Sequence, residues 1–197
     1  MASRAAERFT FDPTAHAYFV GRRRLPSITQ IIAAGRASDA QPWAFSDEAA
    51  ERGDRIHRAT ASFDLGAGWG DDLLDVDVPR VRAYADFLQM MQPVYDEIEQ
   101  PRWSRALQFA GTPDRVGRWR DGRRFVLDIK TGAKSSEHGL QTAGQVLVVE
   151  GRPDARLRYS LHLRPEGDYR LVSWTDARDY VEFMRRLRII TDGGAYG

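Results

Sequence analysis

Two aspartates and a lysine in the middle of the chain have types and spacing suited to phosphodiester chemistry. Pro113-Asp114 is followed, after residues 115–127, by Asp128-Ile129-Lys130. Carboxylates on adjacent strands hold Mg²⁺ or Mn²⁺ through oxygen ligands, and the metal contacts the phosphate and acidifies a bound water. A neighbouring ammonium orients that water and stabilises the charge that develops. These residues predict a hydrolytic site in which Asp114, Asp128 and Lys130 are catalytic and both aspartates bind the metal.

The lysine at position 130 is unusual for this composition. Of the 29 lysines and arginines, only Lys130 and Lys134 are lysines. Scattered at random among basic positions, lysine would occupy this one in about 7% of cases, from 2/29. A compact ammonium is tunable beside a reacting water, whereas arginine is always charged. We therefore interpret Lys130 as a selected residue. The alternative is an accident of a surface hairpin, with Asp128 and Lys130 merely solvated.

The loop at Asp121-Gly122 decides whether the two aspartates share a face of the sheet. A strict two-residue turn would place Asp114 opposite Ile129, so that it points away from Asp128. A three-residue loop with a left-handed Gly122 would place Asp114 directly opposite Asp128. Two facing carboxylates repel each other unless a cation lies between them. A shared metal site therefore predicts the three-residue loop or another one-residue irregularity.

These residues resemble the PD-(D/E)XK nuclease superfamily. The closest branch is that of the RecB-like, phage lambda-exonuclease-like and CRISPR-adaptation nucleases. Pro113-Asp114 matches the PD element, and Asp128-Ile129-Lys130 matches the (D/E)XK element. Gly53-x-x-x-His57 upstream and Gln141 downstream also match that branch. The resemblance covers about residues 46–150.

The resemblance implies further metal ligands. In this branch the histidine that corresponds to His57 binds the metal, which a neutral imidazole can do, and the backbone carbonyl at Ile129 joins the ligand set. An acidic residue near the metal is frequent at the start of the first strand, where Glu99 stands and Glu97 competes with it. The alternative interpretations are a buried, hydrogen-bonded His57 and solvated surface acids.

Other residues are assigned to the reaction or to the substrate. The resemblance places Gln141 among the catalytic residues, as a support for Lys130 or a phosphate; family members often carry a tyrosine four residues later, where this chain has Gln145. Arg115 and Thr131 flank the two aspartates and are predicted to contact DNA phosphates. For Arg115, a position on the opposite face of the sheet is an equally good interpretation.

Composition restricts the cofactor and the compartment. The chain has no cysteine, which excludes disulfides, thiolate nucleophiles and iron–sulfur clusters. Its four histidines have no metalloprotease-like spacing, so Mg²⁺ or Mn²⁺ is the expected cofactor. The net charge of +1 neither favours nor excludes a nucleic-acid partner. Without a signal-like N-terminus or a run of about 18 apolar residues, we expect a cytoplasmic protein with no membrane partner.

Apolar periodicity predicts one α/β domain over residues 1–197, with an N-terminal hairpin and short helix in 1–45. The resemblance implies that residues 46–190 are a nuclease core. The expected elements are a hairpin at 9–20, helices at 27–34, 46–64, 79–92, 137–150 and 175–190, and strands at 98–110, 112–119, 123–130, 155–163 and 168–174. Their order predicts a central mixed sheet with an antiparallel meander, flanked by helices. The resemblance implies the PD-(D/E)XK core.

The leading hypothesis is a metal-dependent deoxyribonuclease. An exonuclease or end-processing enzyme is favoured over a site-specific endonuclease, because no appended recognition domain is visible. The resemblance implies a role in phage or bacterial recombination, repair or DNA processing, with a homo-oligomer or a recombination protein as further partner. One alternative is a nuclease-fold protein that binds DNA or a protein without cutting, although the intact Asp114, Asp128 and Lys130 argue against it. Another is a small α/β protein with no nucleic-acid role.

Overall fold

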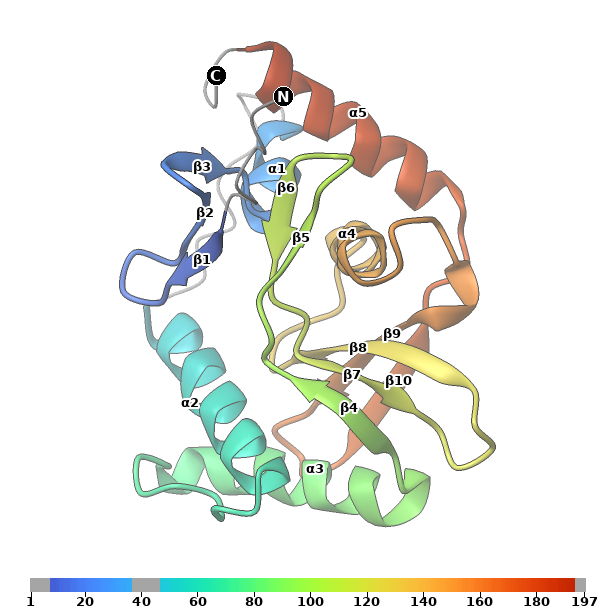
Figure 1. The fold of residues 1–197 in the computed structure, drawn as a ribbon. Coiled ribbons are helices and arrows are strands. Elements are labelled where there is room, and N and C mark those ends of the chain that lie inside the picture. Colours follow the sequence, from blue (N-terminus) through green and yellow to red (C-terminus); the bar gives the residue numbers. More distant parts are fainter. Residues whose placement is uncertain (1–7, 37–46, 194–197) are drawn as a thin grey trace.

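The computed structural model describes residues 8–36 and 47–193, which form an α/β arrangement of helices around a mixed sheet (Figure 1). In chain order the elements are β1 (Phe9–Asp12), β2 (Ala17–Val20), β3 (Arg23–Leu25), α1 (Ile28–Ala34), α2 (Asp47–Asp64), the 3-10 turn η1 (Asp75–Asp77), α3 (Val78–Met91), β4 (Val94–Ile98), β5 (Arg102–Ser104), β6 (Phe109–Gly111), β7 (Arg115–Arg118), β8 (Arg124–Lys130), α4 (Glu137–Glu150), the 3-10 turn η2 (Ala155–Leu157), β9 (Arg158–Leu163), β10 (Tyr169–Ser173) and α5 (Arg178–Asp192).

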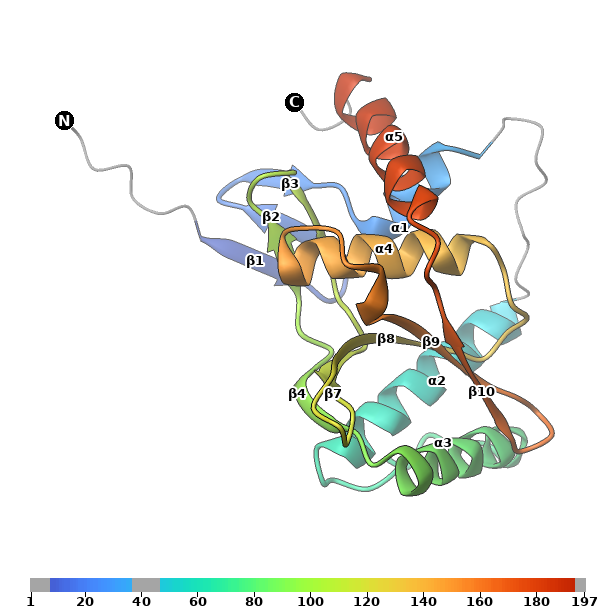
Figure 2. The ribbon, with the colours of Figure 1, turned by 90° about the vertical axis from the view of Figure 1, so that its right-hand side faces the viewer.

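The central sheet has five strands in the order β10-β9-β8-β7-β4. Strands β4, β7 and β8 form an antiparallel meander, and β9 runs parallel to β8 after the chain has crossed over through α4. The predicted mixed sheet with an antiparallel meander is therefore confirmed. Helix α4 lies against one face of the sheet, and α2 and α3 lie against the other (Figure 2).

The alternating side chains of β8 divide the core between these two faces. Val126 packs with residues of α1, α4 and α5, whereas Leu127 and Ile129 pack with residues of α2 and α3. This follows from the two-residue repeat of a strand that is covered on both faces. Asp128 and Lys130 share the face of Val126, so the same repeat directs them toward α4.

The ends of several helices agree with their sequence signals. Ser27 caps α1 through a reciprocal pair of hydrogen bonds with Gln30, and Gly35 follows its last turn. Helix α2 begins its described part at Asp47; the predicted start at Ser46 lies outside the described residues. No helix in the described ranges combines the length and apolar character needed to cross a membrane.

The predicted strand at 98–110 is wrong. Strand β4 ends at Ile98, and the chain then forms a separate two-stranded hairpin of β5 and β6 beside the central sheet. Glu99 and Gln108 adopt left-handed backbone conformations at the two breaks, which a continuous strand does not allow. Pro101 lies between β4 and β5 and has no N–H to donate to a strand ladder. The chain therefore turns twice where the sequence suggested one extended segment.

The loop between β7 and β8 has the predicted three-residue form. Trp119 N donates to Arg123 O at 2.9 Å, and Gly122 has a φ of 83° in the left-handed region. Arg115 pairs with Leu127 in the register that follows. Continued by one residue, this register places Asp114 opposite Asp128. The geometry that brings the two aspartates together at one end of the sheet is thus present.

Candidate metal centre

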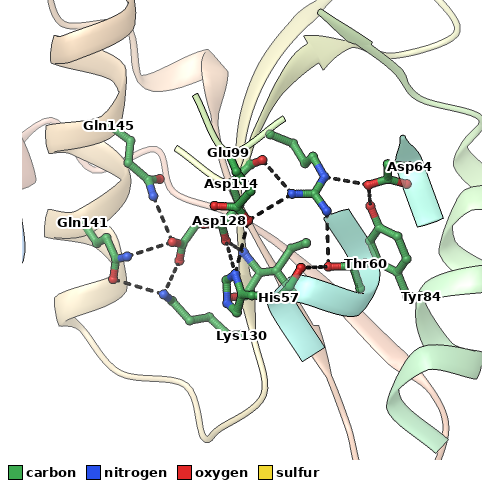
Figure 3. A network of polar contacts seen from close by, with 12 residues as sticks. His57, Thr60, Asp64, Tyr84, Glu99, Asp114, Asp128, Lys130, Gln141 and Gln145 are labelled. Carbon is green, nitrogen blue, oxygen red and sulfur yellow. Dashed lines mark hydrogen bonds and ion pairs between the residues drawn. The ribbon is translucent and has the colours of Figure 1, made fainter. Parts of the chain in front are cut away.

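Three side chains from separate segments converge at that end of the sheet. His57 comes from α2, Glu99 follows β4 and Asp114 precedes β7; we call these residues the metal-ligand cluster (Figure 3). His57 Nδ1 lies 3.6 Å from Glu99 Oε1 and 3.5 Å from Asp114 Oδ2. One ligand atom from each residue lies within 4.8 Å of the others. The cluster therefore offers a nitrogen and two carboxylate oxygens to a single point.

The spacing of these atoms suits a hard divalent cation. Ligands of Mg²⁺ lie about 2.1 Å from the ion, so neighbouring ligands of an octahedral site are about 3 Å apart. The distances of 3.5 and 3.6 Å are near that spacing and longer than a good hydrogen bond. The two carboxylates are ligands of both Mg²⁺ and Mn²⁺, and the imidazole nitrogen is a softer ligand that suits Mn²⁺ better than Mg²⁺. The donor set thus fits the predicted cofactor.

The backbone of β8 orients the imidazole of His57. Its Nε2 lies 3.1 Å from Ile129 O, and because a carbonyl only accepts, Nε2 carries the proton. Nδ1 consequently faces the two carboxylates, as in metal-binding histidines that donate their other ring N–H to a carbonyl. The Ile129 carbonyl thus orients His57 in this structure, and its predicted role as a metal ligand stays a prediction.

Charge in the cluster controls the protonation of His57. Desolvation lowers the pKa of His57, but the negative charges of Asp114 and Glu99 outweigh it and raise the pKa to about 9. Without a metal the ring is therefore an imidazolium at pH 7. A cation that binds at Nδ1 has to replace this proton.

Asp114 is tied to the strand that carries the second aspartate. Its Oδ2 accepts a hydrogen bond from Ile129 N at 2.6 Å, and its side chain is nearly buried. Burial raises the pKa of Asp114, while the charges of His57 and Lys130 act to lower it. A buried carboxylate of this kind is stabilised by nearby positive charge, which a bound cation would add.

Glu99, and not Glu97, belongs to the cluster. Glu99 adopts a left-handed backbone with a φ of 48°, while its N–H donates to Asp114 O at 3.0 Å. Non-glycine residues adopt this conformation rarely and at some energetic cost, which is common at functional sites. Glu97 is paired instead with the exposed Arg102. The predicted choice between the two acids is thus resolved by the backbone turn after β4.

Arg115 is not a surface residue, which corrects its predicted contact with DNA. Its side chain is fully buried on the α2 face of the sheet, the alternative that the sequence left open. The guanidinium donates to Asp64 Oδ2 at 2.6 Å, to Glu99 Oε1 at 3.2 Å and to Asp114 O at 2.7 Å. Arginine is suited to such a fork of acceptors. Through these hydrogen bonds Arg115 positions Glu99 and the backbone of Asp114 from the α2 face of the sheet.

A second group, the lysine network, consists of Asp128, Lys130, Gln141 and Gln145 (Figure 3). Lys130 Nζ lies 2.7 Å from Asp128 Oδ2 and donates to Gln141 Oε1 at 3.1 Å. Gln141 Nε2 and Gln145 Nε2 both donate to Asp128 Oδ1, at 2.8 and 2.9 Å. Burial raises the pKa of Asp128, and the charge of Lys130 acts against that rise. The predicted support of Lys130 by Gln141 is thus present as a direct hydrogen bond.

The structure brings most of the predicted site residues to one end of the sheet, in two groups. Asp128, predicted as a metal ligand, lies in the lysine network and outside the metal-ligand cluster. The reason is that α4 presents two amide donors to its buried carboxylate. Glu99, His57 and Asp114 line a cavity of about 570 Å³ together with Gln141 and Gln145.

Thr131 follows the network and lies half-buried near Gly53 of α2. Its predicted contact with DNA stays a prediction.

The sequence did not predict the residues that hold Arg115 in place next to the metal-ligand cluster. Asp64 accepts from both Arg115 and the hydroxyl of Tyr84, the latter at 2.5 Å, and Thr60 Oγ1 accepts from Arg115 at 3.2 Å. Asp64 and Thr60 precede Arg115 by 51 and 55 positions. No local pattern links residues so far apart, so the sequence carried no signal for this arrangement.

Comparison with known proteins does not assign the chain to a family. No family model matches the chain, and no curated protein matches it in sequence.

Proposed function

We propose that this chain is a Mg²⁺- or Mn²⁺-dependent nuclease of the PD-(D/E)XK type that hydrolyses phosphodiester bonds in DNA. The observation that carries the proposal is the convergence of His57, Glu99 and Asp114 on one point beside Lys130. An exonuclease or end-processing enzyme in recombination, repair or DNA processing is the form that we favour. Mg²⁺ and Mn²⁺ are the cofactors that the donor set supports.

In this proposal the metal-ligand cluster binds the cation and the lysine network stabilises developing charge. A bound divalent cation supplies a Lewis acid for the phosphate and lowers the pKa of a coordinated water. His57, Glu99 and Asp114 would hold it, and Arg115 keeps Glu99 in position. Lys130 offers its ammonium to the charge that develops on the phosphoryl oxygens or to the attacking water. Asp128 and Gln141 hold that ammonium through two contacts, so its position is fixed before substrate arrives.

The deciding experiment is digestion of linear and circular DNA, each single- and double-stranded, with Mg²⁺, Mn²⁺ or EDTA. We expect metal-dependent loss of linear DNA. Glu99→Gln should abolish most of this activity, because it removes a charged ligand. Glu97→Gln is the matched control, since Glu97 is paired with Arg102 outside the cluster.

Three outcomes would count against the proposal. Retarded migration of DNA without cleavage by any preparation would favour a DNA-binding protein that does not cut. Equal activity of the Glu99 and Glu97 variants would remove Glu99 from the site. Cleavage that persists in EDTA would exclude the metal-dependent mechanism.

A further inference from the structure

The lining of the cavity at the metal-ligand cluster includes aromatic side chains from one hairpin, which we call the aromatic wall, and the polar side chains of the cluster, which we call the floor. Phe11, Pro13, His16 and Tyr18, from the β1–β2 hairpin, line the same cavity as His57, Glu99 and Asp114. Figure 1 shows this hairpin above α2, the helix that carries His57. A phosphate held at the floor would therefore bring its neighbouring nucleoside toward aromatic side chains.

The rings of this wall are stacked on one another. Phe11 stacks on Tyr18 with ring centres 4.8 Å apart and an interplanar angle of 28°. His16 meets Phe11 edge-on, with centres 5.4 Å apart. Tyr18 is buried, whereas Phe11 is half-buried and His16 is exposed. Phe11 is thus an aromatic ring with a rigid support behind it and part of its surface in the cavity.

The hairpin is fixed to the segment that carries Asp114. The hydroxyl of Tyr18 lies within 2.9 Å of Thr112 Oγ1, two residues before Asp114. In the turn, Asp12 Oδ1 accepts from Thr14 N at 2.9 Å and Ala15 N at 3.1 Å. His16 then adopts a left-handed backbone with a φ of 45°, in the conformation that histidine tolerates better than most residues. These contacts hold the aromatic wall at a set position relative to the metal-ligand cluster.

We infer that Phe11, supported by Tyr18, stacks against a nucleobase of an unpaired DNA strand whose phosphate lies at the metal-ligand cluster. The inference rests on the proposed function and names its substrate as a single strand or an unpaired end. Every nucleobase has a flat π-face, so aromatic stacking binds strands with little dependence on sequence. A base inside a duplex has both faces covered by its neighbours and is not free to stack on Phe11. The wall therefore selects unpaired nucleotides.

The test measures coupling between the Phe11 ring and one base. One single-stranded oligonucleotide is intact. Each member of a second series lacks the base at one position, and that abasic position differs from one member to the next. Binding is measured with Mn²⁺ in the Lys130→Ala background, where turnover is suppressed. Phe11→Ala should weaken binding of the intact strand by about 5- to 150-fold, the range found when alanine replaces an aromatic residue that stacks on one base. It should have little further effect on the strand whose abasic position falls at Phe11.

Phe9→Ala is the matched control. Phe9 lies on the same strand and also stacks on Tyr18, with ring centres 6.3 Å apart, but it does not line the cavity. We expect Phe9→Ala to bind both strands like the parent protein. Phe11→Trp should bind the intact strand at least as well, because it keeps an aromatic face. The coupled position is the one at which removal of the base cancels the effect of Phe11→Ala. A 2-aminopurine placed there should lose fluorescence when the parent protein binds, and the loss should be smaller with Phe11→Ala.

The outcomes separate this inference from the proposed function. If Phe11→Ala and Phe9→Ala bind alike, or if Phe11→Ala weakens intact and abasic strands equally at every position, the stacking role is overturned. The nuclease proposal would then still be decided by metal-dependent cleavage with unmodified protein. If no variant binds DNA or Mn²⁺, both proposals fall. Coupling at one position, absent with Phe9→Ala, supports the inference.

Discussion

The metal-ligand cluster and the lysine network are built against the same end of β8 from opposite helical layers, α2 and α4, and both contain acidic side chains of low exposure. They differ in how those acids are satisfied. In the lysine network every contact is a hydrogen bond or ion pair of 2.7–3.1 Å. In the metal-ligand cluster the carboxylates accept hydrogen bonds from outside the cluster, Asp114 from Ile129 N at 2.6 Å and Glu99 from Arg115 at 3.2 Å. The imidazole within the cluster stands 3.5 and 3.6 Å from them.

From this difference we expect the metal-ligand cluster, and not the lysine network, to be the group that takes up a cation. The lysine network satisfies its own charges and therefore needs nothing more to hold Lys130 in place. The metal-ligand cluster has two acids and one shared proton on His57, at a spacing that suits an ion better than a direct bond. We expect substitutions in the first group to change turnover, and substitutions in the second to change metal binding as well.

The largest effect is expected for Asp114→Asn. The change removes a charged ligand, while the amide oxygen still accepts from Ile129 N, so the fold is retained. Turnover should fall at least about 1,000-fold, at the upper end of losses seen for charge-stabilising groups. Mn²⁺ affinity, measured by calorimetry, should fall in parallel. Unchanged Mn²⁺ affinity would remove Asp114 from the metal-ligand cluster.

Lys130→Ala should separate turnover from metal binding. We expect turnover to fall about 100-fold or more, because the group that stabilises developing charge is lost. Mn²⁺ affinity should change little, since the Lys130 ammonium has no lone pair to offer to a metal. Lys134→Ala is the matched control: it removes the only other lysine, which is exposed and lies over Trp174. Near-normal activity of Lys130→Ala would contradict the assignment of this residue.

Metal binding should depend on pH through His57. Because its pKa is raised to about 9, the imidazolium must lose a proton when a cation binds at Nδ1. Mn²⁺ affinity should therefore rise by up to about tenfold per pH unit below pH 9 and level off above it. The same raised pKa stabilises the metal-free protein at low pH, an effect that is lost as pH rises through about 9. Calorimetry in buffers of different ionisation enthalpy counts the released proton, and a pH-independent affinity would argue against His57 as a ligand.

The smallest effect is expected for Gln145→Leu. Gln145 Nε2 is one of two amide donors to Asp128, and its Oε1 has no hydrogen-bond partner among the described residues. Loss of the donor destabilises Asp128, while removal of a buried, unpaired oxygen offsets part of that cost. Turnover should fall less than about tenfold, below the typical effect of a group that stabilises charge directly. Gln141→Leu should cost more, because Gln141 contacts both Asp128 and Lys130. A larger loss for Gln145→Leu would reverse the order assigned to the two glutamines.

Much of the central sheet could be predicted because its signals are local. The two-residue repeat of β7 and β8 left two registers open at Asp121-Gly122. The requirement for a shared metal site selected the three-residue loop that the structure has, with Asp114 opposite Asp128. Helix α4 was predicted with the observed ends. The strand at 98–110 could not be predicted correctly, because the left-handed backbone of Glu99 is held by Asp114, fifteen residues further along the chain.

The sequence by itself determined the three motif residues, their common end of the sheet and the hard character of the expected metal. Only the tertiary structure decided that Glu99 joins His57, that Arg115 is buried behind them and that Asp128 turns to α4. The same holds for Phe11, whose approach to the cavity depends on how the N-terminal hairpin packs. The physical reason is that periodicity fixes which face of its own element a residue occupies. Which elements then pack against that face depends on the burial of side chains far apart in the chain.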